Sequence, residues 1–255
     1  MISWEDFNKR SIDLFIQFDL AKKAISGFRE TPEALKCFAE KELDSLKKDM
    51  QGHFEKKGKD IQKSWMYDET KADTYIQSTI DSVPSRLEEI ENRLNQNHII
   101  LLVTLFESFM KDIHKEILTK NPKLLNPDRK IPLGRAVNDG LNKIIEEEIS
   151  REVHSVDRKA IEDRCKYFKE RLSIDWSFDN TAIPLIKSTL EVRNTILHDD
   201  PNFKVDRLQL QVAMAICMGI TMVSTVQAHL LYPESFESPD KSGKLTEHFK
   251  KILNK

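Results

Sequence analysis

The chain has 255 residues, of which 40 are basic and 42 acidic, so its formal net charge is only -2. This balance excludes a general polyanion binder of the histone type, and any contact with nucleic acid must therefore be local. The length suffices for one large or two modest domains with a substantial core.

The composition predicts an all-α protein. Seven glycines, few alternating β-branched runs and abundant Leu, Lys, Glu and Ile favour helices with little or no β-sheet. Residues 1–83 are expected to form an N-terminal helical extension. Its first helix begins near Ser3 and runs toward Gly27, and a second helix follows Pro32 as far as Met50.

A helical domain is expected over residues 84–232, starting with one long helix. Ser82-Val83-Pro84 is typical of a helix start, and apolar residues then follow at spacings of three and four as far as Leu118. Glu107 lies in the most apolar part of this helix, where an unpaired buried carboxylate would be costly. Glu107 therefore either has a partner or faces solvent on an amphipathic helix.

The remaining elements are expected to be helices separated by short loops. Three of them cover residues 133–149, 158–172 and 205–232. Another begins at the N-cap candidates 179–181 and stops before Pro201. A polar tail over residues 233–255 carries a short helix. The apolar run within 205–232 falls short of the roughly 20 apolar residues of a bilayer span. We therefore expect a buried central helix or a subunit interface, and no membrane contact.

Two further features favour a cytoplasmic location. The first residues lack the basic and then apolar pattern of a signal peptide. The three cysteines are widely spaced and form no paired metal pattern, which is typical of reduced thiols. No metal site and no cofactor are expected.

The most informative stretch is residues 193–198, Arg-Asn-Thr-Ile-Leu-His, near a predicted helix end. Positions four apart share a helix face, so Asn194 and His198 are expected to project together, with Arg193 one residue round the turn. A guanidinium grips phosphate oxygens, and an imidazole gives or takes a proton near neutrality. The cluster suits phosphodiester cleavage, with Asp199 as an electrostatic support of the imidazole.

An internal control shows that spacing alone proves little. Arg93 and His98 have the same separation, but the residues between them are largely polar. The later copy differs in the Asn that directly follows its Arg, in the apolar Ile196-Leu197 before its His, and in the helix stop at Pro201.

The Arg193-Asn194-x-x-x-His198 element, with helices before it and a long apolar helix after it, resembles the HEPN superfamily. These small helical domains include many metal-independent ribonucleases of prokaryotic defence and toxin systems. The resemblance covers residues 85–232 and implies a helical bundle of HEPN type. It also implies that Glu107, on an early core helix, orients Arg193 or His198.

The resemblance implies an RNA endonuclease of a toxin or antiviral defence system. The ribose 2'-hydroxyl would attack the adjacent phosphate and leave a cyclic phosphate without a metal. His198 would transfer protons, Arg193 would stabilise the phosphorane, and Asn194 would position one of them or the phosphate.

The expected partners follow from the same resemblance. HEPN domains commonly pair so that two Arg/His elements face each other, which implies a homodimer with a composite active site. RNA is the expected substrate, and an antitoxin or other regulatory protein is a further expected partner.

Two other functions stay open at this stage. One is a non-catalytic HEPN-like module that binds nucleic acid or protein, and the other is a scaffold whose N-terminal helices recognise a partner. The ribonuclease hypothesis requires Arg193 and His198 to be exposed in a shared cleft. In the non-catalytic module, these two side chains would be buried or held in ion pairs. The scaffold predicts exposed apolar surface within residues 1–60.

Overall fold

The computed structural model describes residues 4–30, 37, 41, 69–125, 140–177, 180–233 and 236. Within these ranges it contains six α-helices and no strand, which confirms the predicted all-α class. The chain divides into two compact units, one made of Met1–Phe15 with Asn95–Lys255, the other of Ile16–Leu94. Of the helix predicted after Pro32, only residues 37 and 41 are described, and both are helical; the predicted tail helix lies outside the described residues.

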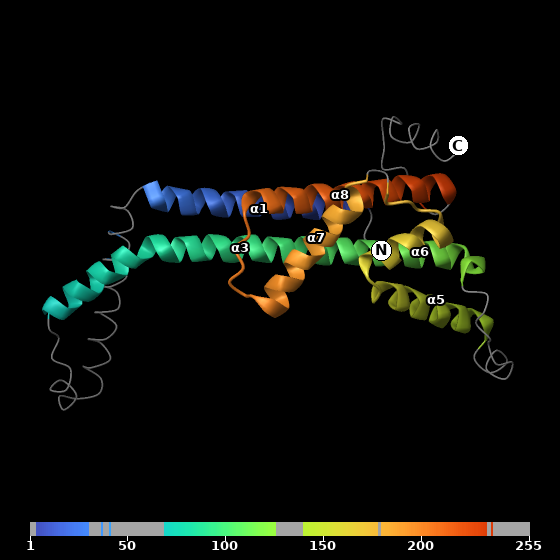
Figure 1. Ribbon diagram of the computed structural model, residues 1–255, viewed down its shortest axis with the longest axis horizontal. Coiled ribbons are helices and arrows are strands. Elements are labelled where there is room, and N and C mark those ends of the chain that lie inside the picture. Colours follow the sequence, from blue (N-terminus) through green and yellow to red (C-terminus); the bar gives the residue numbers. More distant parts are fainter. Residues whose placement is uncertain are drawn as a thin grey trace, which may run out of the picture. The chain divides into compact units, whose positions relative to one another are not determined.

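Two long helices, α1 (Trp4–Glu30) and α3 (Glu69–Lys120), contribute to both units. The start of α1 agrees with the prediction, but the predicted start near Pro84 was wrong, because α3 already begins at Glu69. An interior proline removes one backbone hydrogen bond and usually kinks a helix without having to end it. Figure 1 shows the first turns of α3 inclined to the rest of that helix.

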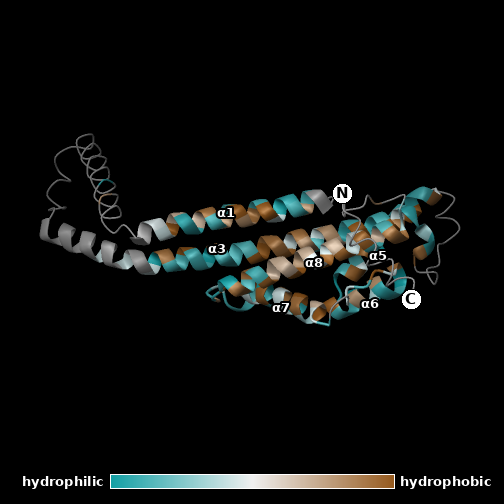
Figure 2. Ribbon diagram, turned by 90° about the horizontal axis from the view of Figure 1, so that it is seen from above, coloured by the Kyte–Doolittle hydropathy of each residue, from teal (hydrophilic) through white to brown (hydrophobic). Residues whose placement is uncertain are grey.

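The unit Ile16–Leu94 consists, in its described part, of α1 and α3 segments that run side by side (Figures 1 and 2). Lys22 and Glu91 join them by an ion pair of 2.9 Å. Ile25 is buried, whereas Ile16 and Leu20, which lie one turn apart on α1, are exposed. This unit therefore leaves part of the apolar surface of α1 uncovered.

The core of the other unit is built on α8 (Arg207–Leu231), which lies beside α3 in both views (Figures 1 and 2). A capping box fixes its start, because Asp206 accepts from the Gln209 N–H at 2.7 Å and Gln209 accepts from the Asp206 N–H at 2.9 Å. α8 is long and apolar enough to cross a membrane, but 56% of its most apolar window is buried within the chain. The sequence left two possibilities for this helix, a buried core helix or a subunit interface, and its buried residues within this unit fit the first. Its apolar length was expected to fall short of a bilayer span, and this expectation was wrong.

Two shorter helices, α5 (Leu141–Asp157) and α6 (Ile161–Leu172), complete one end of this core. The predicted end of α5 at Ile149 was wrong. Its buried face continues past the acidic run to Val156, and Glu148 pairs with Arg151 at 2.7 Å, so consecutive acids do not stop the helix. The α6 residues that face the core are Ile161, Cys165, Phe168 and Leu172.

The helix that carries Arg193, α7 (Ala182–Asn194), crosses α3 and α8 in Figure 1. Ile186 and Thr189 on its inner side are buried. The Thr189 hydroxyl donates to the carbonyl of Leu185 at 2.9 Å, which satisfies this buried polar group within the helix. The buried side of α7 thus fixes the orientation of its last turn.

Candidate functional site

The last turn of the motif helix is not α-helical. After Asn194 the chain forms a π turn, η2 (Thr195–Asp199), in which the Asp200 N–H donates to the carbonyl of Thr195 at 2.8 Å. A π turn advances by a smaller angle per residue than an α turn, so it carries His198 round toward the side of the helix that holds Arg193. Such turns occur frequently at functional sites. Nothing in the α-helical spacing used above predicted it.

Arg193 is held by Glu107, which joins α7 to α3. The Arg193 Nη2 donates to the Glu107 Oε1 at 3.0 Å, and the two side chains are only 23% and 22% exposed. Of the two expectations for Glu107, a partner or a solvent-facing position, the structure has the partner. The Nε of Arg193 is buried and has no hydrogen-bond partner among the described residues.

The other three predicted site residues are exposed. Asn194 ends α7, and His198 and Asp199 lie on the π turn. In the described part of the chain, no side-chain hydrogen bond or ion pair joins these three to one another or to Arg193. The structure thus brings together Arg193 and Glu107, and it leaves the imidazole of His198 exposed on the turn that follows Arg193 in the chain.

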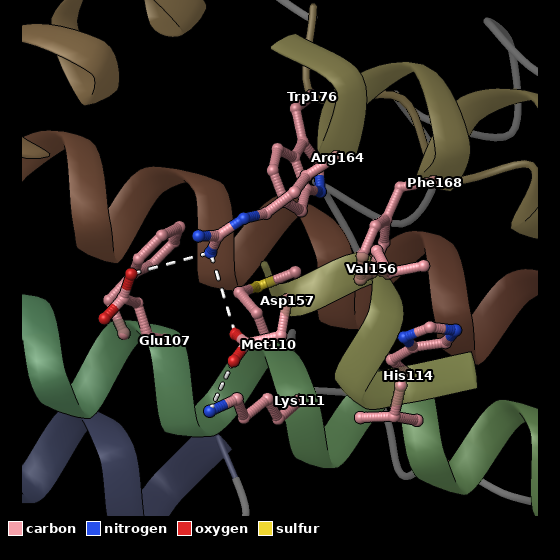
Figure 3. Close-up of a pocket in the computed structure, with 11 residues that line it drawn as sticks. Glu107, Met110, Lys111, His114, Val156, Asp157, Arg164, Phe168 and Trp176 are labelled. Atoms are coloured by element: carbon pink, nitrogen blue, oxygen red, sulfur yellow. Dashed lines mark ion pairs between the residues drawn. The ribbon is translucent and has the colours of Figure 1, made fainter. Parts of the chain in front are cut away.

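Glu107 also belongs to a row of ion-paired side chains, called here the charge chain, which runs from Arg193 through Glu107, Arg164 and Asp157 to Lys111 (Figure 3). Arg164 Nη1 lies 3.5 Å from the Glu107 Oε1 and 3.8 Å from the Asp157 Oδ1, and Lys111 Nζ lies 2.7 Å from the Asp157 Oδ2. With Arg193 the chain has three cations and two carboxylates, a surplus of one positive charge.

Sequence reasoning missed Asp157 and Arg164. They flank the turn between α5 and α6, and both contact residues of α3 that are far away in the sequence. Periodicity assigns residues to faces of one helix, but it does not indicate which face meets which other helix. No local signal marks these two residues as neighbours of Glu107.

A small recess lies beside this charge chain (Figure 3). Its volume is about 20 Å³, which is room for about one water molecule, and its apolar walls include Phe106, Phe168 and Trp176. Gln227 fixes the segment before the tryptophan, because its amide accepts from the Asp175 N–H at 2.6 Å and donates to the Asp175 carbonyl at 3.0 Å. The recess is too small for a nucleobase in this conformation.

A buried histidine forms the far wall of the recess. Burial lowers the pKa of His114 to about 4, and its Nε2 lies 3.1 Å from the Tyr167 hydroxyl. That hydroxyl donates to Glu152 at 3.1 Å, so the imidazole is the donor toward Tyr167. His114 is therefore neutral and hydrogen-bonded near pH 7, and it serves packing in this structure.

The loop that follows the motif is fastened to α3 by two buried amides. Asn95 donates to the Val205 carbonyl at 2.6 Å, and Gln96 donates to the carbonyls of Pro201 and Phe203, both at 2.9 Å. In the sequence these amides stand out only as polar residues between Arg93 and His98. The available signal was the position of these two adjacent amides, just before the apolar run that begins at Ile99.

No metal site is apparent in the described ranges, where no three His, Cys, Asp or Glu side chains lie close enough to hold an ion. Comparisons with protein families, with curated proteins and with solved structures give no match to this chain. The functional argument therefore rests on the chemistry and placement of the residues themselves.

Proposed function

We propose that this protein is an RNA endonuclease of HEPN type, cytoplasmic and independent of metal ions, that acts in a toxin or antiviral defence system. The observation that carries the proposal is the placement of Arg193 and His198. Glu107 holds the guanidinium at 3.0 Å at the end of α7, and the imidazole is exposed on the π turn that follows.

These positions suit the two tasks of cleavage by the 2'-hydroxyl. An exposed imidazole can reach a bound RNA strand and transfer protons between the nucleophile or leaving group and solvent. A guanidinium held in place can stabilise the additional negative charge of the phosphorane. Asn194, at the last position of α7, would position the phosphate, and Asp199 would support the imidazole.

A homodimer with a composite site is part of the proposal. One imidazole cannot easily serve as both proton acceptor and donor, and two facing copies of the motif would supply one for each. The Leu197 side chain, beside His198, is 47% exposed, so apolar surface for such a contact is present at the motif itself. An antitoxin or other regulatory protein would act by covering this surface.

The decisive experiment compares RNA cleavage by the wild type, His198→Ala and Arg193→Ala in EDTA, with end-group analysis and with folding checked by circular dichroism. Arg93→Ala is the matched control, because this arginine has the same spacing to a histidine but is exposed and, among the described residues, pairs only with Glu89. Cyclic phosphate ends that disappear in both motif variants and persist in the control would support the proposal. Cleavage that survives both substitutions would refute it.

The dimer is tested by mixing two inactive variants. In a composite site, His198→Ala and Arg193→Ala subunits would recover part of the activity when they are unfolded together and refolded as mixed dimers. A protein that is monomeric by analytical ultracentrifugation and yet fully active in RNA cleavage would refute the composite site.

Two observations favour the second candidate, a non-catalytic binding module. Arg193 is mostly buried and paired with an acid, and α1 exposes Ile12, Ile16 and Leu20 at intervals of four residues. A protein that binds a 2'-O-methyl RNA or a protein partner but cuts no RNA would belong to this class. Substitution of Ile16 by Asp would then abolish partner binding, whereas in the ribonuclease it would leave cleavage unchanged.

A further inference from the structure

The Glu107 Oε1 is shared by two guanidinium groups. It lies 3.0 Å from the Arg193 Nη2 and 3.5 Å from the Arg164 Nη1. Both cations approach the same oxygen from different helices, α7 and α6. Two cations at one oxygen repel each other, so a closer approach of one weakens the hold on the other.

The two arginines differ in how firmly they are anchored. Arg164 Nε donates to the Lys159 carbonyl at 2.9 Å, and its Nη1 is also within 3.8 Å of the Asp157 Oδ1. For Arg193, Glu107 is the only hydrogen-bonding partner among the described residues, and the buried Nε makes no bond there. Arg193 is therefore the arginine that can leave the carboxylate.

Departure of Arg193 would be costly if Glu107 were left alone. The Glu107 side chain is 22% exposed, and a mostly buried carboxylate that loses its partner is strongly destabilising. Arg164 removes most of this cost because it remains beside the same oxygen. Asp157 and Lys111 continue the charge chain and compensate Arg164 in turn.

We infer that Arg164 is a positioning residue: it competes with Arg193 for Glu107 and holds that carboxylate when Arg193 turns to a phosphodiester. The inference rests on the proposed function for the identity of the anion, and on the geometry above for the competition itself. Arg164 touches neither the substrate nor His198 in this scheme. It sets how readily Arg193 becomes available.

The first test measures the competition without RNA. In nitrogen-15 NMR spectra, the Nε–H signal of Arg193 is assigned by its loss in Arg193→Lys, and its exchange with water is measured. In Arg164→Gln, Glu107 keeps only Arg193, and exchange is expected to slow severalfold. The matched control is Lys166→Gln, which removes the same charge from an exposed position of α6 and leaves the exchange rate unchanged.

The second test measures binding of a 2'-O-methyl RNA oligonucleotide, which cannot be cleaved by this route. Arg164→Gln is expected to weaken the Kd about fivefold, and Asp157→Asn, which frees Arg164 for Glu107, to strengthen it. Plain loss of positive charge would also weaken binding, so both substitutions are repeated in Glu107→Gln. An effect transmitted through Glu107 disappears in that background, whereas a general charge effect persists.

The outcomes separate the two proposals. Slower exchange together with weaker binding that requires Glu107 supports the role of Arg164. Unchanged exchange in Arg164→Gln, equal losses of affinity in Arg164→Gln and Lys166→Gln, or a loss that persists in Glu107→Gln overturns it. Slower exchange in a protein that neither binds nor cuts RNA supports the competition and refutes the ribonuclease. If Glu107→Gln does not fold, the exchange measurement in the single variants decides.

Discussion

Two arginine and histidine pairs with equal spacing have opposite environments in this chain. Arg93 is exposed and pairs with Glu89 at 2.6 Å, whereas His98 is 3% exposed and meets the ring of Phe15 edge-on at 6.3 Å. In the later pair the histidine is exposed and the arginine is mostly buried against an acid.

This reversal bears on the phosphodiester chemistry proposed for the later pair. A buried imidazole cannot reach a substrate in solvent, and burial also lowers the pKa of His98, which disfavours its protonated form. An exposed arginine on a helix surface has little to fix its direction. Of the two pairs, only the one at residues 193 and 198 combines a guanidinium positioned by a carboxylate with an accessible imidazole.

The largest expected effect separates the two histidines. His198→Ala should lower the cleavage rate about 100- to 10,000-fold, the usual loss for a general acid or base, with an unchanged Tm. His98→Ala should leave the activity of the folded protein intact and lower the free energy of unfolding by about 1–3 kcal/mol, because it removes a buried, packed side chain. Cleavage assays and thermal unfolding of both variants test this, and a substantial loss of activity in folded His98→Ala would contradict it.

A second prediction concerns pH and the buried histidines. The pKa of His114 is about 4 in the folded protein and near 6.5 when unfolded, so the unfolded state binds the proton first. The contribution of His114 to the free energy of unfolding is therefore fully present above pH 6.5, and it decreases as the pH falls toward 4. Between pH 7 and pH 5 the loss from this residue is about 2 kcal/mol.

His114→Gln should remove most of that pH dependence, since Gln keeps a hydrogen-bonding group for Tyr167 but does not titrate. Urea unfolding at pH 7 and pH 5 measures the difference. His98→Gln should reduce the slope in the same direction, because burial lowers the pKa of His98 too. Identical slopes in wild type and His114→Gln would show that His114 is protonated as readily in the native state as in the unfolded state.

The third prediction compares the arginines. Arg193→Lys keeps the charge but replaces the planar fork with a point charge, so kcat/KM should fall about tenfold. Arg93→Lys should change neither cleavage nor the free energy of unfolding by more than about 0.5 kcal/mol, because its side chain is 70% exposed. Equal cleavage activity of Arg193→Lys and Arg93→Lys would show that Arg193 has no greater role in cleavage than Arg93.

Much of the fold could be predicted because helices repeat locally. The spacing of apolar residues placed α1, α6, α7 and α8 close to their actual bounds. It misplaced the start of α3 and the end of α5, where Pro84 and the acidic run were taken as boundaries. In both cases the neighbouring helical turns outweighed a local signal.

The site could be predicted only in part, for a related reason. Glu107 was expected either to have a partner or to face solvent, and its partner Arg193 is 86 positions away from it in the sequence. The other links of the charge chain come from helices whose relative placement is decided by packing, which a single sequence does not reveal. The π turn was missed because it results from a backbone hydrogen bond, from Asp200 N–H to the carbonyl of Thr195.

The smallest expected effect concerns the amides that lie between Arg93 and His98. Gln96 donates two hydrogen bonds to the loop after the motif, so Gln96→Ala should cost about 1–2 kcal/mol and loosen that loop. Asn97→Ala is the matched control, because this neighbouring amide is exposed. Hydrogen exchange of residues 200–205 should accelerate in Gln96→Ala only, and cleavage should fall severalfold with it, because the loop supports the end of the π turn. Faster exchange with full cleavage activity would mean that the loop does not position His198. The amide of Gln96 would then contribute to stability but not to the activity of Arg193 and His198.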